Sequence, residues 1–147
     1  MQEYFKISYY QECYIIRCDA GARQDMFDEA GLLCTGPVIE AAVFRIWDDS
    51  EQEPFPIEFD SDNAMFSAYS ADKFSLKAMA DMMNRVFNDD DALRAVLETD
   101  EVKDASMLEK SLAEISLKTP KLYGELGLNP EEPLSPESIA DVLNKLF

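Results

Sequence analysis

The residues that decide the fold open the chain: Tyr4-Phe5-Lys6-Ile7-Ser8-Tyr9-Tyr10, then Gln11-Glu12, then Cys13-Tyr14-Ile15-Ile16-Arg17-Cys18. Both longer runs are rich in aromatic and β-branched side chains, which favour strands, and the two residues between them are polar. This pattern predicts a β-hairpin at the start of the fold.

A second hairpin is predicted in the middle of the chain. Residues 55–59 and 65–69 are two alternating runs that flank the segment Asp60-Ser61-Asp62-Asn63, whose residue types tolerate tight turns. Because short turns join antiparallel strands, the two hairpins predict an antiparallel sheet of at least four strands.

Helices are expected between and after the hairpins, at residues 24–30, from residue 37, from residue 73 and from residue 89. Apolar side chains recur in them every three or four residues, as on one buried helical face. Gly31 ends the first of these helices, Thr35 or Gly36 caps the second, and Asp72 caps the third. The order of elements predicts an α+β fold with helices packed on one face of the sheet.

A change of sequence character near residue 99 indicates two parts, an α+β domain over residues 1–98 and a helical C-terminal extension over residues 99–147 that packs on it. In the extension, the capping box Ser106-Met107-Leu108-Glu109 predicts the start of one helix, and Ser135 caps a final one. Turns and extended chain are expected between them, over residues 119–133, where several prolines and glycines fall.

The charge of the chain limits its partners. Thirty Asp and Glu against thirteen Lys and Arg give a net charge of −17, and the sequence contains no His. A field of that sign repels phosphate backbones and anionic lipid, and it attracts basic surfaces. We therefore expect a basic protein as partner, with neither nucleic acid nor membrane. The absence of a signal-like start and of a long apolar run predicts a cytoplasmic protein.

Catalytic and metal chemistry find little support in the sequence. Without His, a Ser-His-Asp or Cys-His device cannot be assembled within the chain. The three cysteines, Cys13, Cys18 and Cys34, lack CxxC spacing, so we expect reduced and mostly buried thiols. The segment from Asp60 resembles the opening of a calcium loop, but Met65 stands where its glycine belongs. We expect no enzymatic activity, no cofactor and no metal.

Two acidic loops are the candidate interaction sites. One follows the helix that begins near residue 37, the other lies at the tip of the second hairpin, and the candidate residues are Asp48, Asp49, Glu51, Glu53, Asp60 and Asp62. The loops are either solvated segments or a surface that meets Arg and Lys groups of a partner, which would give fast and tight association.

The central stretch carries a family resemblance. Phe27-Asp28-Glu29 precedes Gly31, Gly36 opens the long helix, residues 57–70 form the hairpin, and a later helix ends at residues 89–93. Over about residues 1–98, this arrangement resembles the immunity protein 51 family of bacterial polymorphic toxin systems. The resemblance implies an α+β protein without enzymatic activity that binds and neutralises a toxin produced beside it. Such toxins are often nucleases with basic clefts.

Several functions stay open at this point. The leading hypothesis is an immunity protein that neutralises a basic nuclease toxin of a contact-dependent or polymorphic toxin system. The alternative is a phage-type acidic inhibitor or nucleic-acid mimic of a host nuclease, and further alternatives are a secretion adaptor or a catalytic protein. The sequence leaves open whether the toxin cleaves tRNA, rRNA or DNA, and whether the chain forms a homodimer through a sheet edge.

Overall fold

The computed structural model describes the backbone of residues 1–126 and the side chains of residues 1–115. The chain divides into two compact units, Met1–Lys110 and Ser111–Phe147. The final helix predicted from Ser135 lies outside the described residues. The first turns of the predicted extension belong to the first unit, where Val102 and Ser106 are buried, whereas the packing of residues 111–147 stays a prediction.

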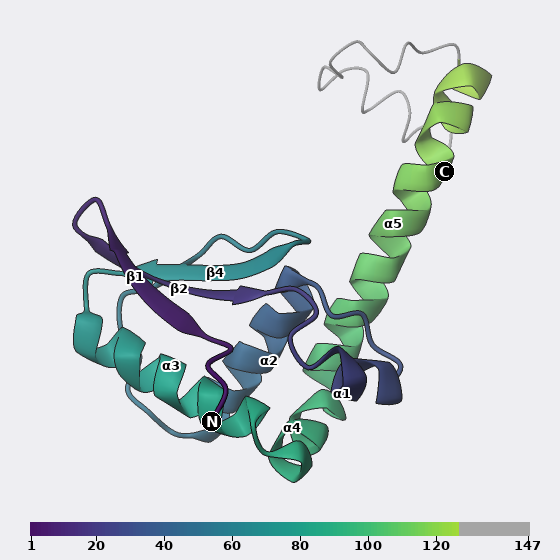
Figure 1. Cartoon of the computed structure of the whole chain (residues 1–147). Helices are drawn as coiled ribbons and strands as arrows, with labels where there is room; N and C mark the ends of the chain where they lie inside the picture. The colour runs from purple at the N-terminus through teal and green to yellow at the C-terminus, as the bar shows by residue number, and fades with distance from the viewer. Residues whose placement is uncertain (127–147) are drawn as a thin grey trace. The chain divides into compact units, whose positions relative to one another are not determined.

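The first unit has the predicted α+β architecture (Figure 1). Its elements are β1 (Lys6–Tyr10), β2 (Cys13–Asp19), α1 (Gln24–Glu29), α2 (Gly36–Asp49), β3 (Glu58–Phe59), β4 (Met65–Ser70), α3 (Lys73–Phe87), α4 (Asp90–Leu97) and the start of α5 (Asp100–Leu126). The predicted caps Thr35, Asp72 and Gly31 occupy the expected helix ends, and the Asp72 carboxylate accepts the Ser75 N–H at 3.1 Å.

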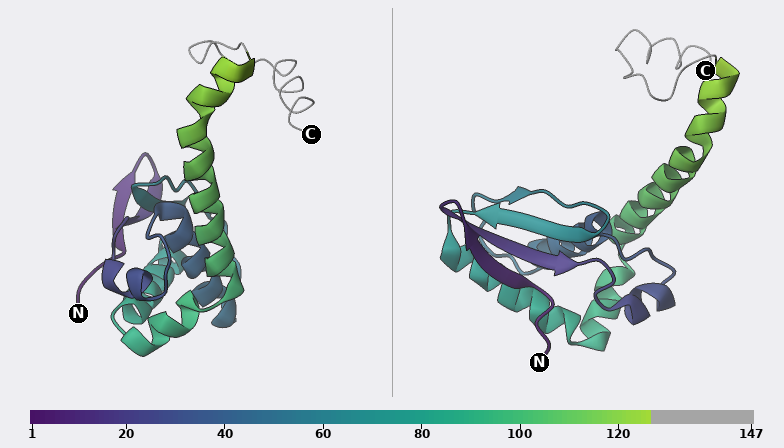
Figure 2. Two further views of the ribbon diagram at one scale, coloured as in Figure 1. Left: turned by 90° about the vertical axis from the view of Figure 1, so that its right-hand side faces the viewer. Right: turned by 45° about the horizontal axis from the view of Figure 1, so that its top comes forward.

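The four strands form one antiparallel sheet in the order β1-β2-β4-β3. Ile16 of β2 lies opposite Ile7 of β1 and Ala68 of β4, so these side chains share one face. The helices α2 and α3 cover that face, as the two views in Figure 2 show. The opposite face of the sheet carries the alternate residues, among them Lys6 and Arg17, and no helix of the first unit covers it.

The hairpin turns differ in how well the sequence predicted them. Gln11 and Glu12 both have positive φ, 48° and 66°, as a two-residue turn between twisted strands requires. The second hairpin is shorter than predicted, because only Glu58–Phe59 pairs with β4, and its turn closes at the bridge between Asp62 and Met65. Pro56 lacks an N–H for a ladder, so the residues before Glu58 run as a loop.

The core lies between the sheet and the helices. Phe5 and Phe87 meet edge to face with ring centroids 4.8 Å apart, and Phe5 also contacts Phe66 at 5.7 Å. All three side chains are buried. Each buried ring contributes roughly 1.5 to 3 kcal/mol through the apolar surface that it removes from water. This aromatic cluster fixes α3 against β1 and β4.

The start of α5 corrects the predicted capping box. The helix begins at Asp100, where acidic residues suit the positive end of the helix dipole. Ser106 lies inside the helix, is 1% exposed, and its hydroxyl oxygen accepts the Leu33 N–H at 2.9 Å. Ser106 therefore ties the segment after α1 to α5 instead of starting a helix.

The later part of α5 corrects a second prediction. The helix continues through Pro120 to Leu126, where we predicted turn and extended chain. Proline costs about 3 kcal/mol in a helix interior relative to alanine, which disfavours a helix without forbidding it. The rest of that predicted segment, residues 127–133, lies outside the described residues.

Candidate partner-binding surface

The longest acidic stretch of the chain lies between Arg45 and Lys73, where no lysine or arginine occurs. It forms the end of α2, the loop to β3, β3 itself and the turn into β4. Six of its carboxylates define what we call the acidic edge: Asp48, Glu51, Glu53, Glu58, Asp60 and Asp62. All six residues are exposed.

Gly36 places one end of this edge. A Cβ at Gly36 would lie 2.0 Å from the Asp62 carbonyl oxygen and 2.3 Å from that of Met65, so only glycine lets α2 approach the turn this closely. The Asp62 side chain stabilises the same turn by accepting the Ala64 N–H at 2.8 Å. The hairpin tip is thereby held against the first residue of α2.

The end of α2 places the other part of the edge. Ser50 caps the helix, its hydroxyl donating to the Trp47 carbonyl oxygen at 2.6 Å, and Glu51 follows with a φ of 56°. Glycine is the usual residue in this left-handed conformation at a helix end. The reversal of the chain at Glu51 directs the loop toward Glu53 and then back to β3.

The predicted candidates fall into two groups. Asp62 contacts the first residue of α2, whereas Asp48 lies twelve residues further along the helix, which corresponds to about 18 Å at 1.5 Å per residue. Glu58 of β3 and Asp60, which follows β3, lie between them, because the ring of Phe59 packs against that of Phe44 on α2 with centroids 4.5 Å apart. The structure therefore arranges the carboxylates along an edge rather than in a cluster.

Asp49 is set apart from the other candidates. Its carboxylate accepts two hydrogen bonds from the Arg45 guanidinium, including one from Nε at 3.0 Å, and Arg45 also binds Glu101 at 3.1 Å. The charge of Asp49 is therefore already offset within the fold. By contrast, Asp48, Glu51 and Glu53 make no ion pair within the part of the chain whose side chains are described.

Glu58 is a member of the edge that the sequence did not single out. The Glu58 carboxylate accepts a hydrogen bond from the Tyr69 hydroxyl, and this contact raises the pKa of Tyr69. The charges of Glu58 and Asp60 add to the effect, because a phenolate beside them would be repelled. The negative potential of the edge thus extends onto β4.

An aromatic hollow opens inside the acidic edge. It has a volume of about 180 Å³, and its lining is Val43, Phe44, Trp47, Asp48, Pro54, Phe55, Ile57, Phe59 and Met79. Trp47 and Phe55 meet edge to face at 5.6 Å, and Phe44 is 45% exposed. The surface therefore combines an apolar recess with the carboxylate of Asp48, while Glu53 and Glu58 directly adjoin lining residues in the chain.

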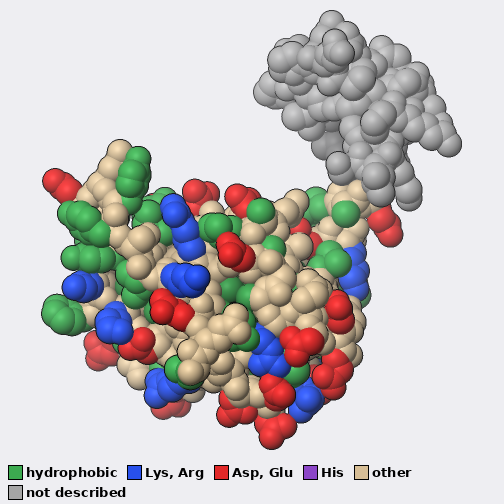
Figure 3. Space-filling model, viewed as in Figure 1, with side chains coloured by type: hydrophobic (Ala, Val, Ile, Leu, Met, Phe, Trp, Pro, Cys, Tyr) green, Lys and Arg blue, Asp and Glu red, His purple; other side chains and the backbone are tan. Residues whose placement is uncertain are grey.

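The acidic residues around α4 serve a different purpose. Asp90 binds Arg23 at 2.6 Å and Asp91 binds Arg94 at 3.0 Å, while Asp89 caps α4. In Figure 3 the Asp and Glu side chains near α4 stand beside Lys and Arg side chains. Most of these carboxylates are partners within the fold, so the acidic edge is the better candidate for binding another molecule.

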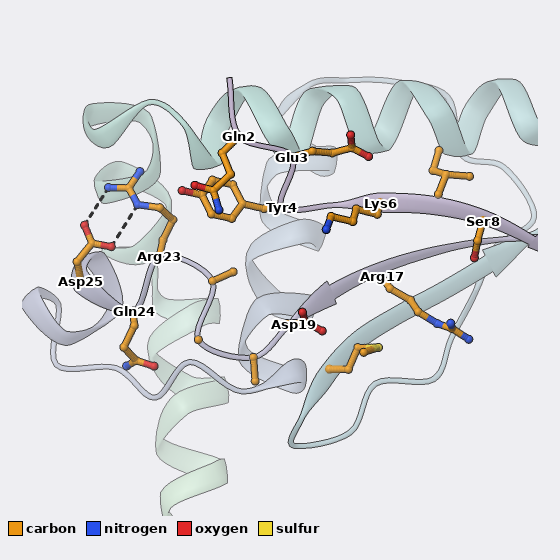
Figure 4. A pocket seen from close by; sticks show the side chains of 15 residues that line it. Gln2, Glu3, Tyr4, Lys6, Ser8, Arg17, Asp19, Arg23, Gln24 and Asp25 are labelled. Atoms are coloured by element: carbon orange, nitrogen blue, oxygen red, sulfur yellow. Dashed lines mark hydrogen bonds and ion pairs between the residues drawn. The ribbon is translucent and has the colours of Figure 1, made fainter.

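Another hollow, of about 890 Å³, lies over β1, β2 and the start of α1 (Figure 4). Its lining carries charged side chains of both signs, and Arg23 is held by Asp25 at 3.1 Å and by the Phe87 carbonyl oxygen at 2.7 Å. Lys6 and Arg17 lie on neighbouring strands at its rim. Arg23 and Asp25 are thus bonded to each other, and no nucleophile paired with a base lines this hollow among the described residues.

The cysteines carry no sign of reactivity. None of the three forms a disulfide, and Cys18 and Cys34 are buried. Burial raises the pKa of the Cys34 thiol to about 11 and raises the pKa of Cys18 as well, so both stay protonated at neutral pH. Among the described residues no group of acidic or cysteine side chains is arranged to hold a metal ion. In the same residues, no helix combines the length and apolarity of a membrane span.

Comparisons with protein-family models, with curated proteins and with solved structures find no match for this chain. The resemblance to the immunity protein 51 family therefore stays a prediction from the sequence, and the function has to be argued from the surface.

Proposed function

We propose that this chain binds a basic protein through the acidic edge, and that it acts as the immunity protein of a basic toxin. The observation that carries the proposal is the aromatic hollow of Phe44, Trp47 and Phe55 with the unpaired carboxylates Asp48 and Glu53 in the same stretch of chain. Buried aromatic anchors inside a polar rim are the arrangement that supplies most binding energy in protein interfaces.

The charges and the hollow have separate tasks in this proposal. A net charge of −17 speeds the encounter with a positive surface, and the effect falls with added salt. The hollow receives an apolar side chain, or the aliphatic part of Lys or Arg, and slows dissociation. A nuclease toxin fits both requirements, because its active site must be basic to hold phosphate groups.

The proposal is tested by capturing partners from a lysate of the source organism with three matched baits. The first is the native chain, and the second carries Asp48→Asn, Glu51→Gln and Glu53→Gln. The third carries Glu12→Gln, Glu98→Gln and Asp104→Asn, which removes the same charge at exposed positions elsewhere. We expect a basic polypeptide on the first and third baits, with at least a severalfold loss on the second, as measured by quantitative mass spectrometry.

A second step distinguishes immunity from other binding. The captured polypeptide is expressed in a laboratory bacterium with and without this chain, and cell survival is counted. We expect the polypeptide to kill and the native chain to protect, whereas a Phe44→Ala variant with the three edge substitutions protects poorly. A harmless captured protein, or protection that does not depend on these residues, would overturn the proposal.

A further inference from the structure

The opposite edge of the sheet, β1, offers main-chain hydrogen bonds. Tyr10 and Cys13 flank the two-residue turn, so they form a hydrogen-bonded pair, and Ile7 and Tyr9 fall at the alternate positions. The N–H and C=O groups of Ile7 and Tyr9 therefore point away from β2. Within the described chain these groups have no hydrogen-bond partner.

Two asparagines already occupy the part of this edge that precedes β1. Asn84 accepts the N–H groups of Tyr4 and Phe5, both at 2.8 Å, and donates to the Phe5 carbonyl oxygen at 2.9 Å. Asn88, one turn further along α3, bonds in the same way to the N–H and C=O of Gln2. These side chains act as a neighbouring strand would, and the pattern stops before Ile7.

A groove of about 650 Å³ continues from this point between β1 and α3. Phe5 and Ile7 line its strand side. The charged residues of α3 that line it are Lys73, Lys77, Asp81 and Arg85, and Lys77 pairs with Asp81 at 3.2 Å. The groove thus combines an open strand edge, an apolar floor and an α3 wall on which three cations outnumber Asp81, while Glu3 adds one carboxylate to the lining.

The cations around β1 are unusual for a chain of charge −17. Lys6 and Arg17 lie opposite each other on the open face of the sheet, while Lys73 and Arg85 line the groove. None of these four makes an ion pair with any residue whose side chain is described, whereas Arg23, Arg45 and Arg94 all do. Figure 3 shows Lys and Arg side chains over β1, β2 and α3, with Asp and Glu side chains between them.

We propose that β1 and α3 form a second binding site, which takes an extended peptide with acidic side chains. The peptide pairs with Ile7 and Tyr9 as a fifth strand, and its carboxylates meet Lys6 on the open face or Lys73 and Arg85 along the groove. Strand addition of this kind draws affinity from the main chain and specificity from alternate side chains. The site is separate from the acidic edge, so it can fail while the proposed function holds.

Charge favours a peptide over a second copy of the chain. Antiparallel pairing of β1 with β1 of another copy would bring the Lys73, Lys77 and Arg85 walls of both molecules toward one another. That arrangement repels, in addition to the repulsion between two chains of charge −17. An acidic strand removes the like-charge contact and supplies the missing ion pairs.

The test is a titration of the ¹⁵N-labelled chain with a short, blocked peptide of alternating glutamate and valine. We expect the Ile7 and Tyr9 amide signals to shift most and to gain protection from hydrogen exchange. The same peptide with lysine in place of glutamate is expected to leave them unchanged. Shifts centred on the acidic edge, equal effects of both peptides, or the same changes on concentrating the chain without peptide would each overturn the proposal.

Matched variants separate the two contributions. Tyr9→Pro removes an outward N–H from an edge strand without touching the ladder to β2, and we expect it to abolish peptide binding with the fold retained. Lys73→Glu with Arg85→Glu should weaken binding by about tenfold, whereas Lys103→Glu, on α5, should not. Unchanged affinity in the charge-reversed variant, or full affinity in Tyr9→Pro, contradicts the assignment.

Discussion

The two edges of the sheet present opposite chemistry. At the β1 edge, Ile7 and Tyr9 leave main-chain groups open near Lys6, Arg17, Lys73 and Arg85, which make no ion pair with any side chain that the structure describes. At the β3 edge, the paired strand is two residues long, and exposed carboxylates follow an edge that includes an aromatic hollow lined by Asp48. The difference shows that charge is distributed unevenly over a chain of net charge −17, with unpaired cations near the β1 edge and carboxylates along the β3 edge.

The largest expected effect is a loss of stability at Gly36, which holds one end of the acidic edge against α2. Gly36→Ala places a methyl group against the backbone of Asp62 and Met65, which cannot move without unpairing the turn, and we expect a loss of about 3 kcal/mol in the free energy of unfolding. Gly31→Ala is the control, because nothing lies within 4 Å of its Cβ and only its positive φ is strained. Denaturant unfolding with equal losses for both variants would contradict the account of Gly36.

A smaller loss is expected at the β1 edge. Asn84→Ala leaves the main-chain groups of Tyr4 and Phe5 without partners, and we expect a cost of about 2 kcal/mol. Hydrogen exchange should show faster exchange of the Phe5 amide, with little change on β3. Asn88→Ala serves as comparison, since its contact with the exposed Gln2 should cost less than about 1 kcal/mol. A slow Phe5 amide in Asn84→Ala would contradict the asparagine ladder.

Substitutions at Glu51 test whether this carboxylate of the acidic edge lowers the stability of the fold. Its φ of 56° suits glycine, so Glu51→Gly should raise the free energy of unfolding by about 0.5 kcal/mol or more. Glu51→Gln, which keeps the strain and removes the charge, should change it little. The thermal midpoints of the two variants decide the point. A destabilised Glu51→Gly would show that the side chain supports the fold instead of a partner.

The smallest expected effect is a change in the pKa of Tyr69. The raised pKa of Tyr69 means that the folded chain holds the phenolic proton more tightly than the unfolded chain, so this contribution is present below about pH 10 and is lost as pH rises through the folded pKa. Glu58→Gln should lower the pKa of Tyr69, measured from its ring ¹³C shift. An unchanged pKa would show that the potential of the edge does not reach β4.

Local sequence pattern accounts for most of the first unit. Alternating aromatic and β-branched runs gave both hairpins, and Asp72, Asp89 and Gly31 marked helix ends correctly because their effects are short-ranged. The capping box at Ser106 failed because its hydroxyl is used by Leu33, a contact across 73 residues. Such tertiary contacts override local propensity, and they cannot be predicted from a short stretch of sequence because their two residues lie far apart in the chain.

The candidate surface was predictable only in part. The acidic loops were visible as charge, and Asp48, Glu51, Glu53, Asp60 and Asp62 are exposed as a binding surface requires. The ion pair between Arg45 and Asp49 could have been predicted from their i, i+4 spacing on one helix. The aromatic hollow and the asparagine ladder depend on how α2, α3 and the strands pack, so they could not be predicted from spacing.

The measurement that tests the central claim most directly is hydrogen exchange of the chain with and without its captured partner. Protection is followed separately at residues 44–62 and at residues 5–10. The account predicts that a basic partner slows exchange in residues 44–62, most strongly around Trp47 and Glu58, and that the three edge substitutions abolish the effect. Protection confined to residues 5–10, or to neither region, would contradict binding through the acidic edge.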